Sequence, residues 1–491
     1  MKTRYSILKA ELALVLWLSL LASCSDFTDI RPKGKSLLTS TNDLELLLNQ
    51  NMELVTRDLG YVGGDFIYSY SDVRPGFLLE NKSRSTLLFG FFDNEASIRR
   101  IELLTTSDNY YTTCYSWIGK MANPILQQLE AASGETSKKT QLKSEALAWR
   151  AFGHYLILQK YAKAYHPQTA ATDPGVIYLT DSVDINVNQK KKSVKACYEL
   201  ALNDINEAIR LDGVPLTPTN KQRLSKAAVY AVKAHICMAM RDYGEAEAAA
   251  KEALRLNGTL YDYWAHAETK TNNYGGAYQV AVVTSMNDPE VYMAFPEYIS
   301  YYWIPPEVSA DIEAGYSRWY LYYKSSDSNL GKPDDGKPTA AENAGLPGWD
   351  GAFLDVSAYD NTSGLTASFM YLYVAECEIR SGNVDAGMDY LDALRKNRLP
   401  ADAYRPLKGR VTTRVEAIRK LQQTSFAELV WTGWNFMQRK RWNLESEWAK
   451  TLSRTIAGVT YTLEPTSDLW VFPFPQPARE VNPNLISNHN R

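Results

Sequence analysis

The chain contains 491 residues, of which 45% are hydrophobic and 22% are charged. This ordinary globular composition excludes a disordered chain, a collagen-like repeat and a protein with many membrane spans. The net charge of −3 offers no overall basic surface for nucleic acid and no polybasic tail for anionic lipid. The unusual feature is the aromatic content of 12%, to which Tyr contributes 32 residues.

Residues 1–23 predict an export signal. Lys2, Arg4 and Lys9 form a positive start, and an apolar stretch runs from Leu12 to Ala22. As a helix this stretch would rise about 16 Å, which is too short to cross a bilayer core of about 30 Å. We therefore interpret the segment as a signal peptide that is removed.

The end of this segment, Leu21-Ala22-Ser23-Cys24, is similar to a bacterial lipobox. There a signal peptidase cleaves before the cysteine, whose thiol carries a diacylglycerol. Because more than one acyl chain gives stable anchoring, Cys24 would hold the protein on a membrane. Residues 24–40 then read as a lipidated tether. An ordinary secretory signal with a chance cysteine is the alternative.

The other cysteines are Cys114, Cys197, Cys237 and Cys377. None forms a CxxC motif, and each lies in a helical apolar pattern where a small hydrophobic side chain fits. Although an exported chain could pair them, the pattern favours buried free thiols.

Helical periodicity dominates the chain from residue 111 onward, and few alternating strand patterns compete with it. The spacing of apolar residues predicts helices over 111–131, 141–162, 193–211, 221–241, 243–256, 366–382, 384–397 and 413–436.

Some of these helices form pairs with the spacing of tetratricopeptide repeats. Small residues recur where two helix backbones would approach closely. The predicted close-approach positions are Ala234, Ala246 and Ala253 in one pair, Ala386 and Ala393 in a second, and Ala201 and Ala208 in a third.

The predicted fold class is mostly α: a tetratricopeptide-like helical-repeat solenoid with a loop-rich, aromatic-rich region laid on it. Residues 24–491 would form one compact unit. Its parts are an N-terminal helical region (41–258) that includes an irregular stretch at 57–94, a loop-rich ligand-binding region (259–365), C-terminal helices (366–463) and a Pro-rich, non-helical tail (464–491).

The aromatic excess is concentrated between Tyr292 and Tyr323, where eleven of 32 residues are aromatic. Pro296, Pro305 and Pro306 argue against a helix here. A Tyr or Trp ring can stack on the C–H face of a sugar while its polar tip reaches a hydroxyl. About half of these rings should be buried structure. The candidates for ligand binding are Tyr298, Tyr301, Tyr302, Trp303 and Trp319, with Trp349 farther along the chain.

No arrangement of residues predicts catalysis, a cofactor or a metal. The five histidines lack metal-ligand spacing, and His154 and His235 fit packed or capping roles in helices. No nucleophile elbow, phosphate loop or dinucleotide fingerprint occurs. Glu376 and Glu378 are two apart on a predicted helix and thus on different faces. The remaining interpretations are structural: a turn at Asp334-Asp335-Gly336 and core packing for Trp431, Trp434, Trp442 and Trp448.

The order of several short stretches resembles the SusD/RagB family of surface lipoproteins. No single stretch is specific, but their order and spacing extend over more than 400 residues. They are Cys24 to Phe27 with Pro32, Tyr115 to Asn123, Glu145 to Tyr155, Tyr198 to Ala208, Ala227 to Ala253, Tyr373 to Glu376, Leu391 to Arg398, Glu428 to Gly433, Arg441-Trp442, Pro473 to Pro475 and Asn482 to Leu485.

The resemblance implies a non-catalytic, lipid-anchored protein on the exterior of the outer membrane. It would bind oligosaccharide or polysaccharide and deliver it to a SusC-like TonB-dependent β-barrel transporter. Family members bind sugar through the middle loop region and the first irregular region, where this chain offers Tyr68, Tyr70, Asp72 and Arg74. Arg74 could present a planar fork to a carboxylate or to paired hydroxyls.

The chain departs from the family pattern at Thr432, Asn435 and Gln438, where acidic residues and an arginine are common. We interpret these positions as structural, so the departure indicates a divergent subgroup. Two other functions stay open. The ligand could be a peptide, as some relatives are thought to bind, or the chain could be a scaffold that binds only proteins.

Overall fold

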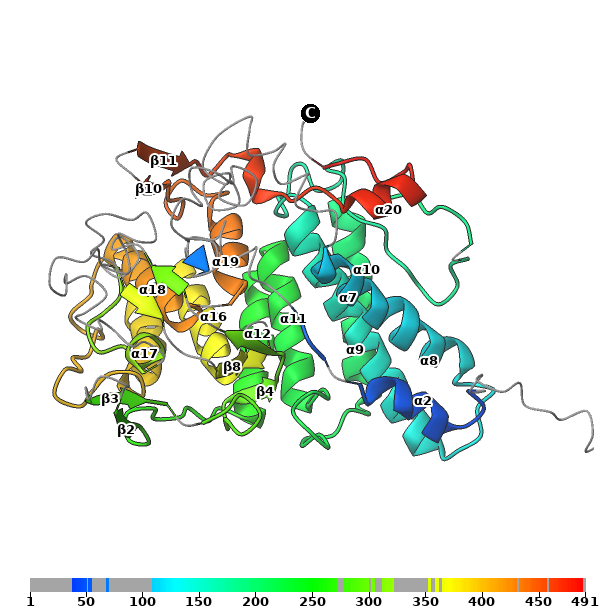
Figure 1. Cartoon of the computed structure of the whole chain (residues 1–491), viewed down its shortest axis with the longest axis horizontal. Helices are drawn as coiled ribbons and strands as arrows, with labels where there is room; N and C mark the ends of the chain where they lie inside the picture. The colour runs from blue at the N-terminus through cyan, green and yellow to red at the C-terminus, as the bar shows by residue number, and fades with distance from the viewer. Residues whose placement is uncertain are drawn as a thin grey trace, which may run out of the picture.

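The computed structural model confirms that the chain is mostly helical (Figure 1). The structure describes residues 38–50, 52–54, 68–69, 108–184, 186–271, 277–281, 283–299, 302–304, 311–321, 352–354, 358–361, 364–430, 432–456 and 459–488.

The helices of the N-terminal half follow the predicted periodicity closely. A π-helical segment, Trp117–Ala122, interrupts the first predicted helix. The α-helices are α2 (Thr41–Leu48), α7 (Asn109–Ser116), α8 (Asn123–Gln128), α9 (Thr136–Tyr161), α10 (Val194–Leu211), α11 (Lys226–Met240) and α12 (Tyr243–Leu256).

The C-terminal half adds a second group of helices beside the first (Figure 1). Each long helix from α9 to α17 contacts the next long helix along the chain, and α12 packs on α16 across the intervening residues. A repeat solenoid would have such neighbour contacts, and the repeat arrangement itself stays a prediction. The group comprises α14 (Ser317–Tyr320), α16 (Ala367–Arg380), α17 (Val384–Lys396), α18 (Arg414–Glu428), α19 (Trp434–Trp442), a 3₁₀ turn (Asp468–Trp470) and α20 (Gln476–Val481).

Three predicted helix boundaries are wrong. Helix α9 begins at Thr136, before the predicted start at residue 141. Hydrogen bonds outside the helical pattern decide the other two boundaries. The helix predicted from residue 221 begins at Lys226, where the Ser225 hydroxyl accepts from the Ala228 N–H at 3.1 Å. The backbone before Lys226 makes a hydrogen bond to a distant segment and does not extend the helix, because the Lys221 carbonyl accepts from the Ala294 N–H at 2.6 Å.

The helix predicted over 413–436 is also wrong, because α18 ends at Glu428 and α19 begins at Trp434. The Thr432 hydroxyl donates to the Leu429 carbonyl at 2.7 Å. A continuing helix would have offered that carbonyl to the N–H of Gly433, so the side chain competes with the helix.

The small residues of two helix pairs lie where the repeat spacing places them. Ala234, Ala246 and Ala253 of the first pair and Ala201 and Ala208 of the second are all buried. Helix α11 packs on α12, and α9 packs on α10. In the third pair the predicted positions are wrong: Ala386 and Ala393 are only half-buried.

The close approach of α16 and α17 is made instead at Gly387. A Cβ atom at this position would stand 2.6 Å from Ile379 Cγ1 and 3.0 Å from the Ala375 carbonyl oxygen. The sequence pattern predicted this contact at Ala386, one residue too early. The residue that makes the contact depends on how each helix is rotated about its axis, and the local pattern does not specify that rotation.

The strands are short and concentrate in the region predicted as loop-rich. All of their pairings are antiparallel, and β2–β3 and β10–β11 are local hairpins. The strands are β1 (Tyr68–Ser69), β2 (Glu268–Thr271), β3 (Ala277–Val280), β4 (Val291–Met293), β5 (Pro296–Ile299), β6 (Tyr302–Ile304), β7 (Ala352–Leu354), β8 (Ala358–Asn361), β9 (Leu365–Thr366), β10 (Leu452–Ile456) and β11 (Val459–Leu463).

Six of these strands form three successive antiparallel pairs, which we together call the central ribbon. Strands β4, β5 and β6 pair in turn with β9, β8 and β7. The register runs from Val291 opposite Thr366, through Pro296 opposite Asn361, to Ile304 opposite Ala352. The region between the two helical groups thus carries an ordered ladder of backbone pairs in addition to its predicted loops.

The base of the central ribbon is buried in the helical core. The Phe295 ring stacks on Trp117, with centroids 4.9 Å apart and planes 10° apart. It also lies parallel to Phe152 at 6.1 Å. The Tyr292 hydroxyl donates to the Asn257 carbonyl at 2.5 Å. The ribbon therefore starts from a rigid aromatic cluster.

The C-terminal tail was predicted to be non-helical, which is wrong over one short stretch. The segment Gln476–Val481 forms α20, with proline at its start. Proline suits a first helical turn, because the N–H groups there have no partner within the helix. The tail then packs back on the core, where Asn488 Nδ2 donates to the carbonyls of Tyr161 and Gly175 at 2.7 and 2.8 Å.

The four cysteines after Cys24 confirm the sequence interpretation. Cys114, Cys197, Cys237 and Cys377 are buried and unpaired. Burial raises the pKa of each thiol above its ordinary value. They are therefore packing residues with little thiolate character.

Replacing Gly387 by alanine should destabilise the fold by about 1–3 kcal/mol, because the added methyl group overpacks the α16–α17 contact. Urea unfolding measures the change. Gly244→Ala is the matched control, since Gly244 is also near a helix start but has no atom within 4 Å of its Cβ position. The control should stay within about 1 kcal/mol of the parent. Equal effects of the two substitutions would contradict the assigned contact.

Candidate functional site

The outer part of the central ribbon meets a third strand from far away in the chain. Strand β1 pairs with β6, with Tyr68 opposite Trp303 and Ser69 opposite Tyr302. The sheet order is β1-β6-β7. Backbone hydrogen bonding thus brings the first irregular region and the aromatic-rich region to one place.

The predicted ligand-binding residues fall into two groups. Tyr302 and Trp303 are in β6, Tyr298 is in β5 opposite Tyr359, and Trp319 is in α14. Tyr301 immediately precedes β6 and Tyr70 immediately follows β1 in the sequence. The residues outside the described part of the chain are Tyr70, Asp72, Arg74, Tyr301, Trp349 and the predicted lipidation site Cys24. Ligand binding by all of these residues stays a prediction.

Several aromatics of the dense segment are core residues, as expected for part of the cluster. Tyr292, Phe295 and Tyr316 are at most 2% exposed. They face the helices and cannot contact a ligand at the surface. The candidates for ligand binding between residues 292 and 323 are therefore the aromatic residues other than these three buried ones.

A buried ion cluster lies beneath the base of the ribbon. Arg398, just beyond α17, is 0% exposed. Its guanidinium donates to Glu428 at 2.8 and 2.9 Å and to Glu290 at 2.7 Å. A further hydrogen bond from the guanidinium reaches the Tyr261 carbonyl at 2.9 Å. One arginine thus joins the end of α18 to the residue before β4.

The two carboxylates of this cluster ionise differently. Burial raises the pKa of Glu290 to about 7, with Arg398 opposing the shift. Burial also acts to raise the pKa of Glu428, but attraction to Arg398 and its hydrogen bonds lower it. Glu428 is therefore the ionised partner of Arg398 at neutral pH, whereas Glu290 is near its titration point.

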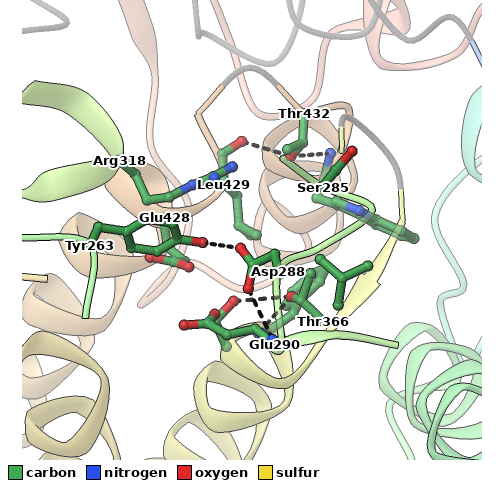
Figure 2. Close-up of a pocket in the computed structure, with 13 residues that line it drawn as sticks. Tyr263, Ser285, Asp288, Glu290, Arg318, Thr366, Glu428, Leu429 and Thr432 are labelled. Atoms are coloured by element: carbon green, nitrogen blue, oxygen red, sulfur yellow. Dashed lines mark hydrogen bonds between the residues drawn. The ribbon is translucent and has the colours of Figure 1, made fainter. Parts of the chain in front are cut away.

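A small polar cavity adjoins the cluster (Figure 2). Tyr263 donates to Asp288 at 2.5 Å, and Asp288 accepts from the Glu290 N–H at 2.9 Å. The side chains of Arg318 and Thr432 approach from the other elements that line it. Its volume of about 30 Å³ suits one water molecule and is far too small for a sugar ring. We therefore interpret this cavity as part of the buried polar region beneath the ribbon, and not as a ligand site.

The buried histidines are structural, as the sequence suggested. His154 Nδ1 bonds to the Arg150 carbonyl at 2.9 Å, and its Nε2 accepts from the Leu179 N–H at 2.9 Å. His235 Nδ1 bonds to the Tyr373 hydroxyl at 2.7 Å. Burial lowers the pKa of both imidazoles to about 3. They stay neutral and help to pack the helices.

The carboxylates considered for catalysis are held apart. Glu376 is buried against Arg441 at 2.6 Å, whereas Glu378 faces Lys251 at 3.0 Å. This confirms that the two residues lie on different faces of α16. Among the described residues, no group of three or more histidine, cysteine, aspartate or glutamate side chains could hold a metal ion.

The departures from the family pattern are buried structural residues, as interpreted from the sequence. Thr432, Asn435 and Gln438 are at most 5% exposed. Asn435 Nδ2 donates to the Phe426 carbonyl at 3.1 Å, and Gln438 accepts from Arg441 at 3.0 Å. Trp434, Trp442 and Trp448 are core residues as predicted, and Trp431 lies outside the described residues.

A family model described as "Starch-binding associating with outer membrane" matches residues 90–238. The solved structure of a SusD superfamily protein from Bacteroides thetaiotaomicron is 17% identical, with a TM-score of 0.61 over 92% of this chain and 100% of the other. The chain has a SusD-like fold. No curated protein sequence matches it.

Two further solved structures share this SusD-like fold. A putative sugar binding protein from Bacteroides vulgatus is 16% identical, with a TM-score of 0.63 over 93% of this chain and 100% of the other. A SusD-like carbohydrate binding protein from the same species is 14% identical, with a TM-score of 0.58 over 92% and 98%. At these identities the likeness establishes the shared fold.

The family description associates SusD-like proteins with the outer membrane. Within the described ranges of this chain, no helix is long and apolar enough to cross a membrane.

The ion cluster makes stability depend on pH through Glu290. Its folded-state pKa of about 7 lies above the ordinary 4.5, so the stabilising contribution of the neutral carboxyl is complete below about pH 4.5 and is lost as pH rises through 7. Glu290→Gln removes the titration. Between about pH 5 and pH 8 the parent should lose roughly 1–3 kcal/mol relative to this variant.

Urea unfolding of both proteins at the two pH values measures this difference. Glu130→Gln, at an exposed position, is the control and should follow the parent. Parallel pH dependence of the parent and Glu290→Gln would show that Glu290 does not titrate in this range.

Proposed function

We propose that this chain is a non-catalytic, lipid-anchored protein of the outer membrane that captures oligosaccharide at the outer part of the central ribbon. The pairing of β1 with β6 carries the proposal, since it joins Tyr68 and Ser69 to Tyr302 and Trp303. Aromatic residues from both predicted ligand-binding regions thereby lie on adjacent strands. The family description as starch-binding supports the same ligand class.

The architecture suits capture by a preformed surface. The ribbon is held by backbone pairing within each of its three strand pairs and by buried aromatic and ionic contacts at its base. Rings on such a scaffold lose little freedom when a ligand arrives, which favours affinity. Several rings in sequence would follow a glycan chain, with stacking as the main contact.

The delivery step follows from the family resemblance. Cys24 would carry the lipid anchor, and the helical side of the molecule would rest on a SusC-like TonB-dependent transporter. The ribbon would then hold the glycan over the mouth of the barrel. In this arrangement the chain concentrates the nutrient and needs no bond-breaking residues.

Alanine at both Trp303 and Trp319 should reduce glycan affinity by at least about tenfold, because each ring supplies stacking area that water cannot replace. Isothermal titration calorimetry against a panel of starch and other plant or host oligosaccharides measures the loss. Tyr404→Ala, a half-buried aromatic on the loop after α17, is the control and should bind normally. Unchanged affinity in the double variant would refute a site at these rings, and binding of peptides alone would favour the peptide alternative.

Cys24→Ala should release the protein from the membrane, since one thiol carries the whole anchor. Cell fractionation measures the change, with Cys197→Ala as the control because that thiol is buried. The lipidated parent, extracted in detergent, should also co-purify with a β-barrel protein. Membrane retention of Cys24→Ala would contradict the anchor, and recovery of the parent without any barrel would contradict the transporter partnership.

A further inference from the structure

A third aromatic position joins Tyr68 and Trp303 on one face of the three-stranded sheet. In the order β1-β6-β7, Tyr68 is opposite Trp303, and Trp303 is opposite Phe353. Residues directly opposite each other in an antiparallel pair lie on the same face of the sheet. Tyr68, Trp303 and Phe353 therefore share one face, and we call these three positions the aromatic row.

The remaining residues of these strands belong to the opposite face. Successive residues of a strand alternate between the two faces, so Tyr302 and Ile304 are on the face away from Trp303. Their partners in the register share that face: Ser69 and Leu354 opposite Tyr302, and Ala352 opposite Ile304. Two aromatic residues that are adjacent in the sequence thus belong to different faces of the sheet.

Neither face has the composition of a surface that only water covers. An antiparallel sheet that exposes one face to water commonly carries polar residues on that face. The residues that form β1, β6 and β7 include no charged residue, and most of them are aromatic or aliphatic. We therefore expect each face to be covered, either by the protein or by a ligand.

The two faces differ in the kind of cover that suits them. Ile304, Ala352 and Leu354 are aliphatic and have no hydrogen-bonding atom in their side chains, so their face suits packing against protein. In the aromatic row, Tyr68 and Trp303 each combine an apolar ring with a polar tip. A sugar presents C–H groups to such rings and hydroxyls to such tips. The aromatic row is therefore on the face that suits a glycan.

The length and charge of the aromatic row define the class of ligand. Neighbouring strands are about 4.8 Å apart, so the row extends over roughly 10 Å from Tyr68 to Phe353. This length exceeds one sugar ring and suits at least two linked units. No residue of the three strands carries a charge. A carboxylate or sulfate group on the ligand would therefore lose its water without gaining a partner from these strands.

We propose, on the basis of the proposed function, that the aromatic row binds two or more linked units of a neutral oligosaccharide and that Phe353 is its third binding position. Trp303 occupies the middle of the row, between Tyr68 and Phe353. Tyr302 is on the other face and does not belong to this contact. The strand register thus selects which aromatic residues of the ribbon act together.

Variants at two neighbouring positions of β7 test the assignment of faces. Calorimetry on the full chain uses maltotriose and cellotriose as neutral probes. Phe353→Leu keeps an apolar side chain but removes the ring, so it should weaken binding of these probes by at least about fivefold. Phe353→Tyr keeps a ring and should bind like the parent. Leu354→Val, at the next position and on the other face, is the matched control and should also bind like the parent.

Binding of different sugars by the parent chain tests the size and charge of the ligand. A neutral trisaccharide should bind at least about tenfold more tightly than glucose, because a single unit meets only part of the aromatic row. Trigalacturonate should bind at least about tenfold more weakly than the neutral trisaccharide, because its carboxylates find no partner. Equal binding of glucose would overturn the predicted length. Binding of trigalacturonate alone, or of neither trisaccharide class, would overturn the neutral ligand.

The variant at Trp303 separates this proposal from the proposed function. Parent-like binding by Phe353→Leu, together with loss of binding in Trp303→Ala, would overturn the role of Phe353 and leave a glycan site at the ribbon. Equal losses in Phe353→Leu and Leu354→Val would overturn the assignment of faces. Parent-like binding by both Phe353→Leu and Trp303→Ala would contradict the site itself.

Discussion

The buried guanidinium of Arg398 is the contact on which the arrangement of this molecule depends. It lies between Glu428 at the end of α18 and Glu290 just before β4. Loss of one member of such a cluster leaves a buried charge without a partner, at a cost of about 3–5 kcal/mol. These ion pairs therefore fix the start of β4 against the end of α18. The position of the rest of the central ribbon, including its predicted ligand-binding residues, depends on this attachment.

Helix α18 serves two regions of the protein through two of its faces. Glu428 points into the ion cluster and supports the ribbon. Phe426, two residues earlier and thus on another face, lines a cavity between α18 and α19 with Trp442 and Trp448.

Much of the helical architecture was predictable, because periodicity and caps are local properties. The errors arose where a distant partner overruled the local pattern. Lys221 pairs with the chain beyond β4 and is not helical, and Thr432 competes for a helix carbonyl. Gly387, and not Ala386, meets Ile379 because the rotation of α16 selects it. The aromatic density at 292–323 was visible, but burial of Tyr292, Phe295 and Tyr316 was not.

Local sequence patterns were enough to predict most of the helices, the buried thiols and the separation of Glu376 from Glu378, since each follows from residues a few positions apart. Tertiary packing set the pairing of Tyr68 with Trp303 and the contact between Arg398 and Glu290, 108 residues away. It also decided that Trp448 closes a cavity between two helices. Helix hydrogen bonds link residues four apart, whereas sheet register and cavities depend on packing between distant segments, which local patterns do not encode.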